Sequence, residues 1–176
     1  MSEIDSGVLD RVQRGKKVSV GKEEIMSILP HRGRMLLLDR VVITSQTAIG
    51  EFLVTEEVCK GHAVTGGELI FRGVDIEEMS AQLLGVLWGV QHPDFTNKTG
   101  LLREIGRSKF FGGPVFVGDL LIVEIGRGNI KERILGGPEP DRISIALVAK
   151  EFSARVRKDK RATVEFIKLI IGSPKA

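Results

Sequence analysis

The stretch GVDIEEMSAQLLGVLWGV, residues 73–90, decides the fold of this 176-residue chain. Acidic residues fill its first turns, where carboxylates favour the positive end of a helix dipole. From Met79 onward, apolar and small residues lie nearly all round the expected helix. A helix that is apolar on all sides has to be enclosed by the rest of the protein. We therefore predict a long central helix over residues 74–90.

Segments on both sides of this helix supply the enclosure. Residues 21–29 are predicted to form a short amphipathic helix that ends before Pro30, because the residue before a proline is pushed out of the helical region. Extended segments are expected at residues 35–43, 48–55, 101–105, 109–116, 120–125, 143–152 and 162–171. One long antiparallel sheet curled around the central helix would give a stable α+β fold. We expect residues 1–21 to be an N-terminal extension and residues 22–176 to form a single domain.

The composition excludes several classes of protein. The net charge is only +3, and eight phenylalanines, one tryptophan and no tyrosine offer few stacking surfaces, so we predict no nucleic-acid partner. No apolar run approaches the roughly 20 residues of a membrane span. A single cysteine, Cys59, cannot form an internal disulfide, which suits a protein of the reducing cytoplasm. No His, Cys or Asp cluster has the spacing of metal ligands, so we predict no metal.

His62 and Glu78 are the residues that point to chemistry. His62 follows Gly61 in a glycine-rich turn, and Glu78 comes sixteen residues later, near the start of the predicted helix. A histidine that titrates near neutrality, together with a half-buried acid, suits elimination or hydration next to a carbonyl group. Glu78 shares one helix face with Asp75 and Gln82, and an enclosed polar stripe is costly unless its groups are paired or used. Gln82 could hydrogen-bond and orient Glu78 one turn away, or it could simply make a buried hydrogen bond of its own.

Structural alternatives exist for these assignments. His62 could simply cap a turn, and Glu77 serves the helix dipole as well as Glu78 does. For His31, the structural role is the one we expect: it would fasten the Pro30 turn to the sheet and take no part in chemistry. The assignments therefore depend on the wider pattern of motifs.

Four separated motifs resemble those of the β-hydroxyacyl-(acyl carrier protein) dehydratases, in the same order. They are Ile28–Arg32 with Met35–Val41, then Gly61-His62, then Gly73–Gly85 with its Ala81-Gln82 pair, and finally Phe111 with Pro114-Val115 and Gly118-Asp119. The match spans roughly residues 22–171. The resemblance implies a hot-dog fold and a homodimer whose two sheets are continuous, with a trimer of dimers as a possible larger assembly.

The resemblance also implies a reaction. A 3-hydroxyacyl thioester, on acyl carrier protein or coenzyme A, would be dehydrated to a trans-2-enoyl thioester, or the enoyl thioester hydrated in reverse. His62 would remove the α-proton, and Glu78 of the other subunit would act on the β-hydroxyl. The backbone N–H of Gly73, at the helix N-terminus, would donate to the thioester oxygen, and Gln82 would line the same site. No bound cofactor is implied, because the pantetheine arm belongs to the substrate.

The loop after His62 departs from the family pattern. It reaches Gly73 without a proline and is slightly longer, and Arg72 puts a cation beside the helix N-terminus. Two rival functions on the same fold therefore stay open: an acyl-thioesterase, and a non-catalytic subunit that binds acyl chains. Basic residues within 103–109 or 155–161 are candidates for guiding an acidic carrier protein to the site.

Overall fold

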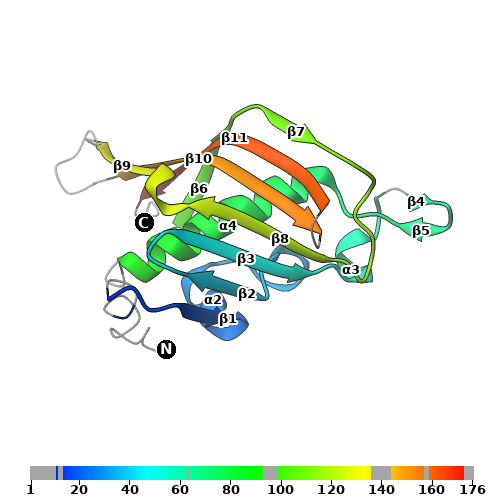
Figure 1. The fold of residues 1–176 in the computed structure, drawn as a ribbon, viewed down its shortest axis with the longest axis horizontal. Helices are drawn as coiled ribbons and strands as arrows, with labels where there is room; N and C mark the ends of the chain where they lie inside the picture. The colour runs from blue at the N-terminus through cyan, green and yellow to red at the C-terminus, as the bar shows by residue number, and fades with distance from the viewer. Residues whose placement is uncertain are drawn as a thin grey trace.

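The computed structural model describes residues 11, 14–62, 64–92, 99–135, 144–156 and 159–172. At its centre lies helix α4, Gly73–Gln91, which confirms the predicted long helix and adds one residue at each end. Figure 1 shows α4 running along the length of the molecule behind the sheet. Most of its residues from Ile76 onward are buried, so the predicted enclosure is also confirmed. No helix among the described residues is long and apolar enough to cross a membrane.

An antiparallel sheet, with nine strands in the described part of the chain, curves around α4 (Figure 1). Its strands follow the order β1-β2-β3-β8-β10-β11-β6, with β7 beside β11 and β9 beside β10. Their bounds are β1 Val18–Gly21, β2 Arg40–Ile43, β3 Thr47–Leu53, β6 Thr99–Ile105, β7 Ser108–Phe110, β8 Leu120–Gly126, β9 Ile130–Leu135, β10 Ser144–Val156 and β11 Asp159–Gly172. Along β3 and β8, buried residues alternate with more exposed ones, so one face of the sheet packs inward. The predicted α+β arrangement, one sheet wrapped around one long helix, is confirmed.

The sheet begins earlier in the chain than predicted. Strand β1 pairs antiparallel with β2 along its whole length. The expected N-terminal extension over residues 1–21 is therefore corrected, since its last four residues belong to the sheet. Val18 and Val20 are buried and Ser19 between them is exposed. This alternation covers too few residues to stand out beside the lysines that precede it.

Other elements differ from the prediction in their extent. The extended segment expected over residues 35–43 becomes a strand only at Arg40, because Gly33–Met35 form a 3₁₀ turn and the next residues are irregular. The segment expected over residues 109–116 is a strand only as far as Phe110. Strand β9 and three short elements escaped prediction; the short ones are helix α3, Glu56–Cys59, and strands β4, Val64–Thr65, and β5, Glu68–Leu69.

Helix α2, Lys22–Ile28, confirms the short helix before Pro30 and packs against glycines of α4. A Cβ atom added at Gly89 would lie 2.3 Å from Ile28 Cγ2, and one added at Gly85 would lie 2.9 Å from Leu29 Cδ2. Only a residue without a side chain allows α2 this close approach. The glycines of α4 therefore bring the end of α2, and the turn that follows it, close to the central helix.

Gly89→Ala is expected to lower the free energy of unfolding by about 1–3 kcal/mol, the usual cost of overpacking a core. Alanine is favoured over glycine in a helix by about 1 kcal/mol, but a 2.3 Å contact can be relieved only by displacing Ile28. Guanidinium-induced unfolding measures the change. In an Ile28→Ala background, which removes the clashing methyl group, the same substitution should be neutral or stabilising. An equal loss in both backgrounds would contradict this packing.

Candidate active site

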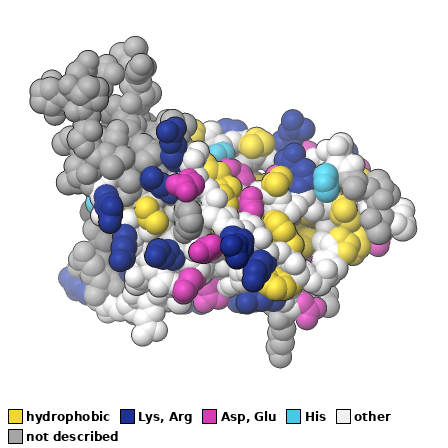
Figure 2. All heavy atoms as spheres, turned by 90° about the horizontal axis from the view of Figure 1, so that it is seen from above, with side chains coloured by type: hydrophobic (Ala, Val, Ile, Leu, Met, Phe, Trp, Pro, Cys, Tyr) yellow, Lys and Arg dark blue, Asp and Glu magenta, His cyan; other side chains and the backbone are white. Residues whose placement is uncertain are grey.

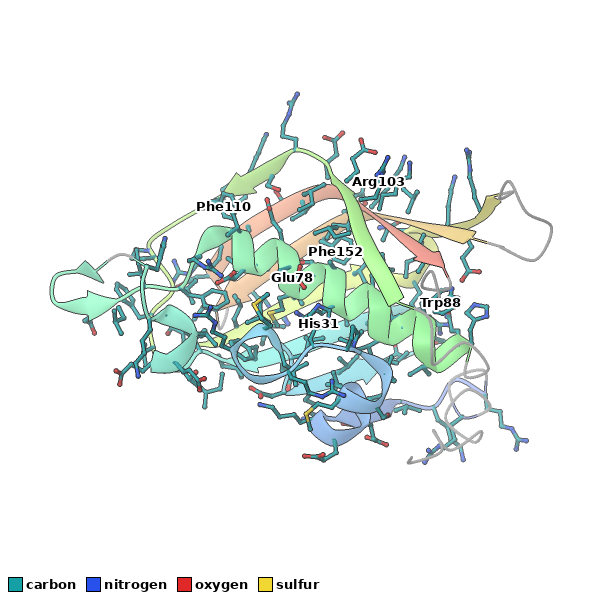
Figure 3. The ribbon with its side chains drawn as sticks, turned by 180° about the vertical axis from the view of Figure 1, so that it is seen from behind. His31, Glu78, Trp88, Arg103, Phe110 and Phe152 are labelled. Atoms are coloured by element: carbon teal, nitrogen blue, oxygen red, sulfur yellow. The ribbon has the colours of Figure 1, made fainter. Side chains whose placement is uncertain are left out.

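Glu78 lies near the start of α4, and Figure 3 shows His31 beside it. Two side chains converge on one of its carboxylate oxygens. His31 Nε2 lies 3.2 Å from Glu78 Oε1, and Gln82 Nε2 donates a hydrogen bond of 2.9 Å to the same oxygen. Within the described residues, Glu78 Oε2 accepts no hydrogen bond. The Glu78 side chain is 25% exposed. One carboxylate oxygen is thus held by the protein, and the other has no hydrogen-bond partner among the described residues.

The orientation of the Gln82 amide is fixed by the backbone of the segment before β2. Its Oε1 accepts the N–H of Leu37 at 2.9 Å, and its Nε2 donates to the carbonyl of Met35 at 2.7 Å as well as to Glu78. Reversing the amide would break all three bonds, so the N–H of Gln82 must face the carboxylate. The hydrogen bond that the one-turn spacing of Gln82 and Glu78 predicts is present. Gln82 also fixes the irregular segment 35–37 against α4.

These contacts lower the pKa of the Glu78 carboxyl below its ordinary value. The hydrogen bond from His31 is the largest cause. Burial acts in the opposite direction, while the hydrogen bond from Gln82 and the charge of His31 lower the pKa further. Because the lowering contributions prevail, Glu78 is a carboxylate at neutral pH and can accept a proton.

His31 reaches Glu78 from the turn after α2, and Arg32 holds that turn. The Arg32 guanidinium donates to the carbonyls of Met26, Leu29 and His31 over 2.8, 2.7 and 2.7 Å. The bond to Met26 satisfies a carbonyl in the last turn of α2, and the other two fix the chain just after it. The expectation that His31 fastens the turn differs from the structure, in which Arg32 fastens the turn and His31 faces the carboxylate. Forty-seven residues separate His31 from Glu78, so no local spacing could reveal their contact.

The structure places His62 on the surface, just after helix α3. Its Nδ1 lies 3.2 Å from the carbonyl oxygen of Ile70, and its backbone N–H donates to Cys59 at 3.3 Å. Among the described residues, no contact joins His62 to Glu78. A single chain therefore does not bring the two predicted catalytic residues together.

The loop between His62 and α4 contains the hairpin β4–β5. Gly66 and Gly67 at its tip have φ values of +62° and +85°, which glycine adopts without strain. Figure 1 shows this hairpin projecting from the body of the molecule. At its base, the N–H of Phe71 donates to the carbonyl of Val115 over 2.8 Å. The loop that lacks the family's prolines is thus shaped by a hairpin and anchored by backbone pairing.

Gly73 is the first residue of α4, where a helix leaves backbone N–H groups unpaired. A Cβ atom at this position would lie 3.0 Å from Phe110 Cε1, so glycine allows the ring of Phe110 to cover that side of the helix start. The cation of Arg72 is paired with the buried carboxylate of Asp75 through bonds of 2.8 and 2.7 Å. Asp75 is therefore engaged, and Glu78 is the acid of the predicted stripe with an oxygen still available. Within the described residues, no three His, Cys, Asp or Glu side chains are grouped to hold a metal ion.

Comparison with known proteins finds relatives among the dehydratases. The 3-hydroxyacyl-[acyl-carrier-protein] dehydratase FabZ of Geobacter metallireducens is 34% identical over 116 residues, which are 63% of this chain and 75% of that protein. The protein of the same name from Enterococcus faecalis is 38% identical over 106 residues, 58% of this chain and 72% of its own length. No family model matches the chain.

A solved structure shares the fold. A chain of the dehydratase heterocomplex ApeI:P from Xenorhabdus doucetiae superposes with a TM-score of 0.55 at 18% identity, covering 86% of this chain and 91% of that one. An antiparallel sheet wrapped around one long buried helix defines this protein as a hot-dog protein. By its identity to these relatives, the chain belongs to the 3-hydroxyacyl-[acyl-carrier-protein] dehydratase FabZ family, as its four motifs predicted.

Proposed function

We propose that this protein dehydrates a 3-hydroxyacyl thioester, carried on acyl carrier protein, to a trans-2-enoyl thioester, and catalyses the reverse hydration. The observation that carries the proposal is Glu78, a carboxylate with one oxygen fixed by the protein and the other available at the start of the buried helix. Membership of a dehydratase family favours this reaction over thioester hydrolysis. A carboxylate held in this way suits the transfer of a proton to or from a β-hydroxyl group.

In the hydration direction, the reaction begins at Glu78. Glu78 takes a proton from a water molecule as the water oxygen bonds to the β-carbon, and the double-bond electrons move through the α-carbon onto the thioester oxygen. The N–H of Gly73 stabilises the resulting enolate. Protonated His62 then gives its proton to the α-carbon. Water has been added across the double bond, His62 has lost a proton and Glu78 has gained one, and exchange with solvent restores both groups. Dehydration is the same path in reverse.

This mechanism requires two subunits. His62 and Glu78 are not in contact within one chain, so we propose that His62 of a second copy completes each site. The free edge of β6 supports a dimer, because within the described sheet β6 is an end strand that pairs only with β11. An edge strand presents unpaired N–H and C=O groups that a second copy can fill. We propose a homodimer as the minimal unit, with a trimer of dimers as the candidate larger assembly.

The carrier and the compartment are inferred from the charge of the chain and from its single cysteine. Arg103, Arg107 and Lys109 on and between β6 and β7 are exposed, and residues 157–158 of the second basic segment lie outside the described residues. Figure 2 shows Lys and Arg side chains over one face with Asp and Glu side chains among them. We therefore attribute steering of the acidic carrier protein to the net charge of +3 more than to one patch. The buried free thiol of Cys59 agrees with the cytoplasmic location that we propose.

Hydration of enoyl thioesters by the purified protein tests the proposal. Short and medium acyl chains, each on acyl carrier protein and on coenzyme A, would be followed through loss of the conjugated absorbance. We expect hydration, with a higher kcat/KM for the carrier-protein substrates. Release of free thiol without hydration would instead establish a thioesterase. Tight binding without turnover would establish a non-catalytic acyl-binding subunit.

A further inference from the structure

We propose that His31 is a positioning residue for Glu78: it fixes Oε1 of the carboxylate, so that Oε2 faces the substrate. The inference rests on the proposed function and extends it to a residue in the turn after α2. The contact that carries it is the 3.2 Å approach of His31 Nε2 to Glu78 Oε1.

Two donors on a single oxygen define the rotation of the carboxylate. Gln82 alone would leave Glu78 free to turn about the bond to its carboxylate carbon, because one hydrogen bond restrains one direction only. His31 approaches Oε1 from a different element, the turn after α2, whereas Gln82 approaches from α4 itself. With both bonds made, Oε2 is the oxygen without a partner among the described residues. Such fixed geometry matters, because a displacement of about 1 Å in a catalytic group can cost roughly 100-fold in rate.

The imidazole of His31 directs its Nε2 toward Glu78 and buries its Nδ1. His31 Nδ1 is buried and has no hydrogen-bond partner within the described residues. In neutral His31, the tautomer with its proton on Nε2 donates to Glu78 and leaves only an unfilled lone pair inside, whereas a proton on Nδ1 would be a buried donor without an acceptor. The backbone of His31 is fixed in turn by Arg32, which binds its carbonyl at 2.7 Å. His31 therefore has a fixed position from which to act on Glu78.

Charged groups nearby do not compete with His31 for this role. On α4, the carboxylate of Asp75 is paired with Arg72. In the turn after α2, the guanidinium of Arg32 is directed to backbone carbonyls. Among the described residues, His31 is the one titratable group in contact with Glu78. The state of the carboxylate should therefore respond to substitution of His31.

The direction of the pH effect follows from the contacts. His31 is the largest influence that lowers the pKa of Glu78, and burial is the influence that raises it. Removing His31 leaves burial opposed mainly by Gln82, so the pKa of Glu78 should rise. Hydration requires ionised Glu78 and is lost as pH falls through that pKa. In His31→Ala, the acidic limb of the hydration profile should therefore move to higher pH.

The test compares His31→Ala with His31→Gln, whose amide nitrogen can replace the donor at Nε2. Carboxyl carbons labelled with ¹³C report the titration of Glu78 by NMR, and Glu78→Gln identifies its signal. We expect the titration midpoint to rise in His31→Ala and to lie between wild type and His31→Ala in His31→Gln. For enoyl-thioester hydration, kcat should fall about 10- to 100-fold in His31→Ala with a smaller change in KM. His31→Gln should recover most of kcat.

The outcomes separate this inference from the proposed function. An unchanged Glu78 titration in both variants would overturn the positioning role, whether or not the protein is active. A raised titration midpoint in a protein that hydrates no enoyl thioester would support the positioning role and reject the proposed function. Gel filtration and thermal unfolding establish that each variant is folded. If His31→Ala does not fold, an identical titration and kcat in wild type and His31→Asn, whose shorter amide cannot reach Glu78, would overturn the inference.

Discussion

Glu78→Gln should lower kcat/KM for enoyl-thioester hydration by about 10²–10⁴-fold, the range expected when a general acid–base group is removed. The amide has nearly the shape of the carboxylate, and its oxygen can still accept the hydrogen bond from Gln82. It cannot take a proton from water at any accessible pH. The fold should therefore survive while the chemistry is lost, as measured by initial rates across chain lengths.

Glu77→Gln is the matched control for this variant, because the two residues are neighbours on α4 and carry the same charge. The sequence offered Glu77 as the competing acid. We expect Glu77→Gln to keep kcat/KM within a few-fold of wild type. Activity lost in Glu77→Gln but kept in Glu78→Gln would reverse the assignment of the acid.

His62→Ala should reduce hydration by about 10²–10⁴-fold as well, since it removes the group that supplies the α-proton. The stronger prediction concerns mixtures, because each site is proposed to combine His62 of one subunit with Glu78 of another. A heterodimer of His62→Ala and Glu78→Gln subunits contains one doubly altered site and one intact site. Random pairing at equal amounts should thus restore about one quarter of the wild-type activity.

The mixing experiment needs subunits that exchange. The two inactive variants would be co-expressed with different affinity tags, and the doubly tagged species purified and assayed. Recovery of activity in that species alone would establish that the site is shared between subunits. If the heterodimer is as inactive as either parent, the site is not shared between subunits, and His62 and Glu78 act within one subunit. A His62→Ala parent that keeps its activity would show that His62 has no catalytic role. Mixing His62→Ala with wild type provides the control for exchange itself.

The course of α4 could be predicted because its signal is local. Apolar side chains on every face demand enclosure, and the acids in its first turns mark its beginning, so the sequence predicts a helix over 74–90, one residue short of α4 at each end. Strands β8 and β3 likewise have alternating burial that a period of two predicts. Strand β1 escaped because four residues are too few to show a period.

In the candidate site, too, local features could be predicted and long-range contacts could not. The sequence by itself determined that Glu78 lies on an enclosed helix and that Gln82 lies one turn after it on the same face. Both conclusions depend only on the pattern of residues along the helix. It also determined the family, through four motifs in order. Only the tertiary structure decided that His31 contacts Glu78 and that Asp75 is paired with Arg72. It also placed His62 at the surface of its own chain. Those contacts depend on how α2 docks on the glycines of α4 and on where the loop after His62 is anchored, and no spacing along the chain encodes such long-range packing.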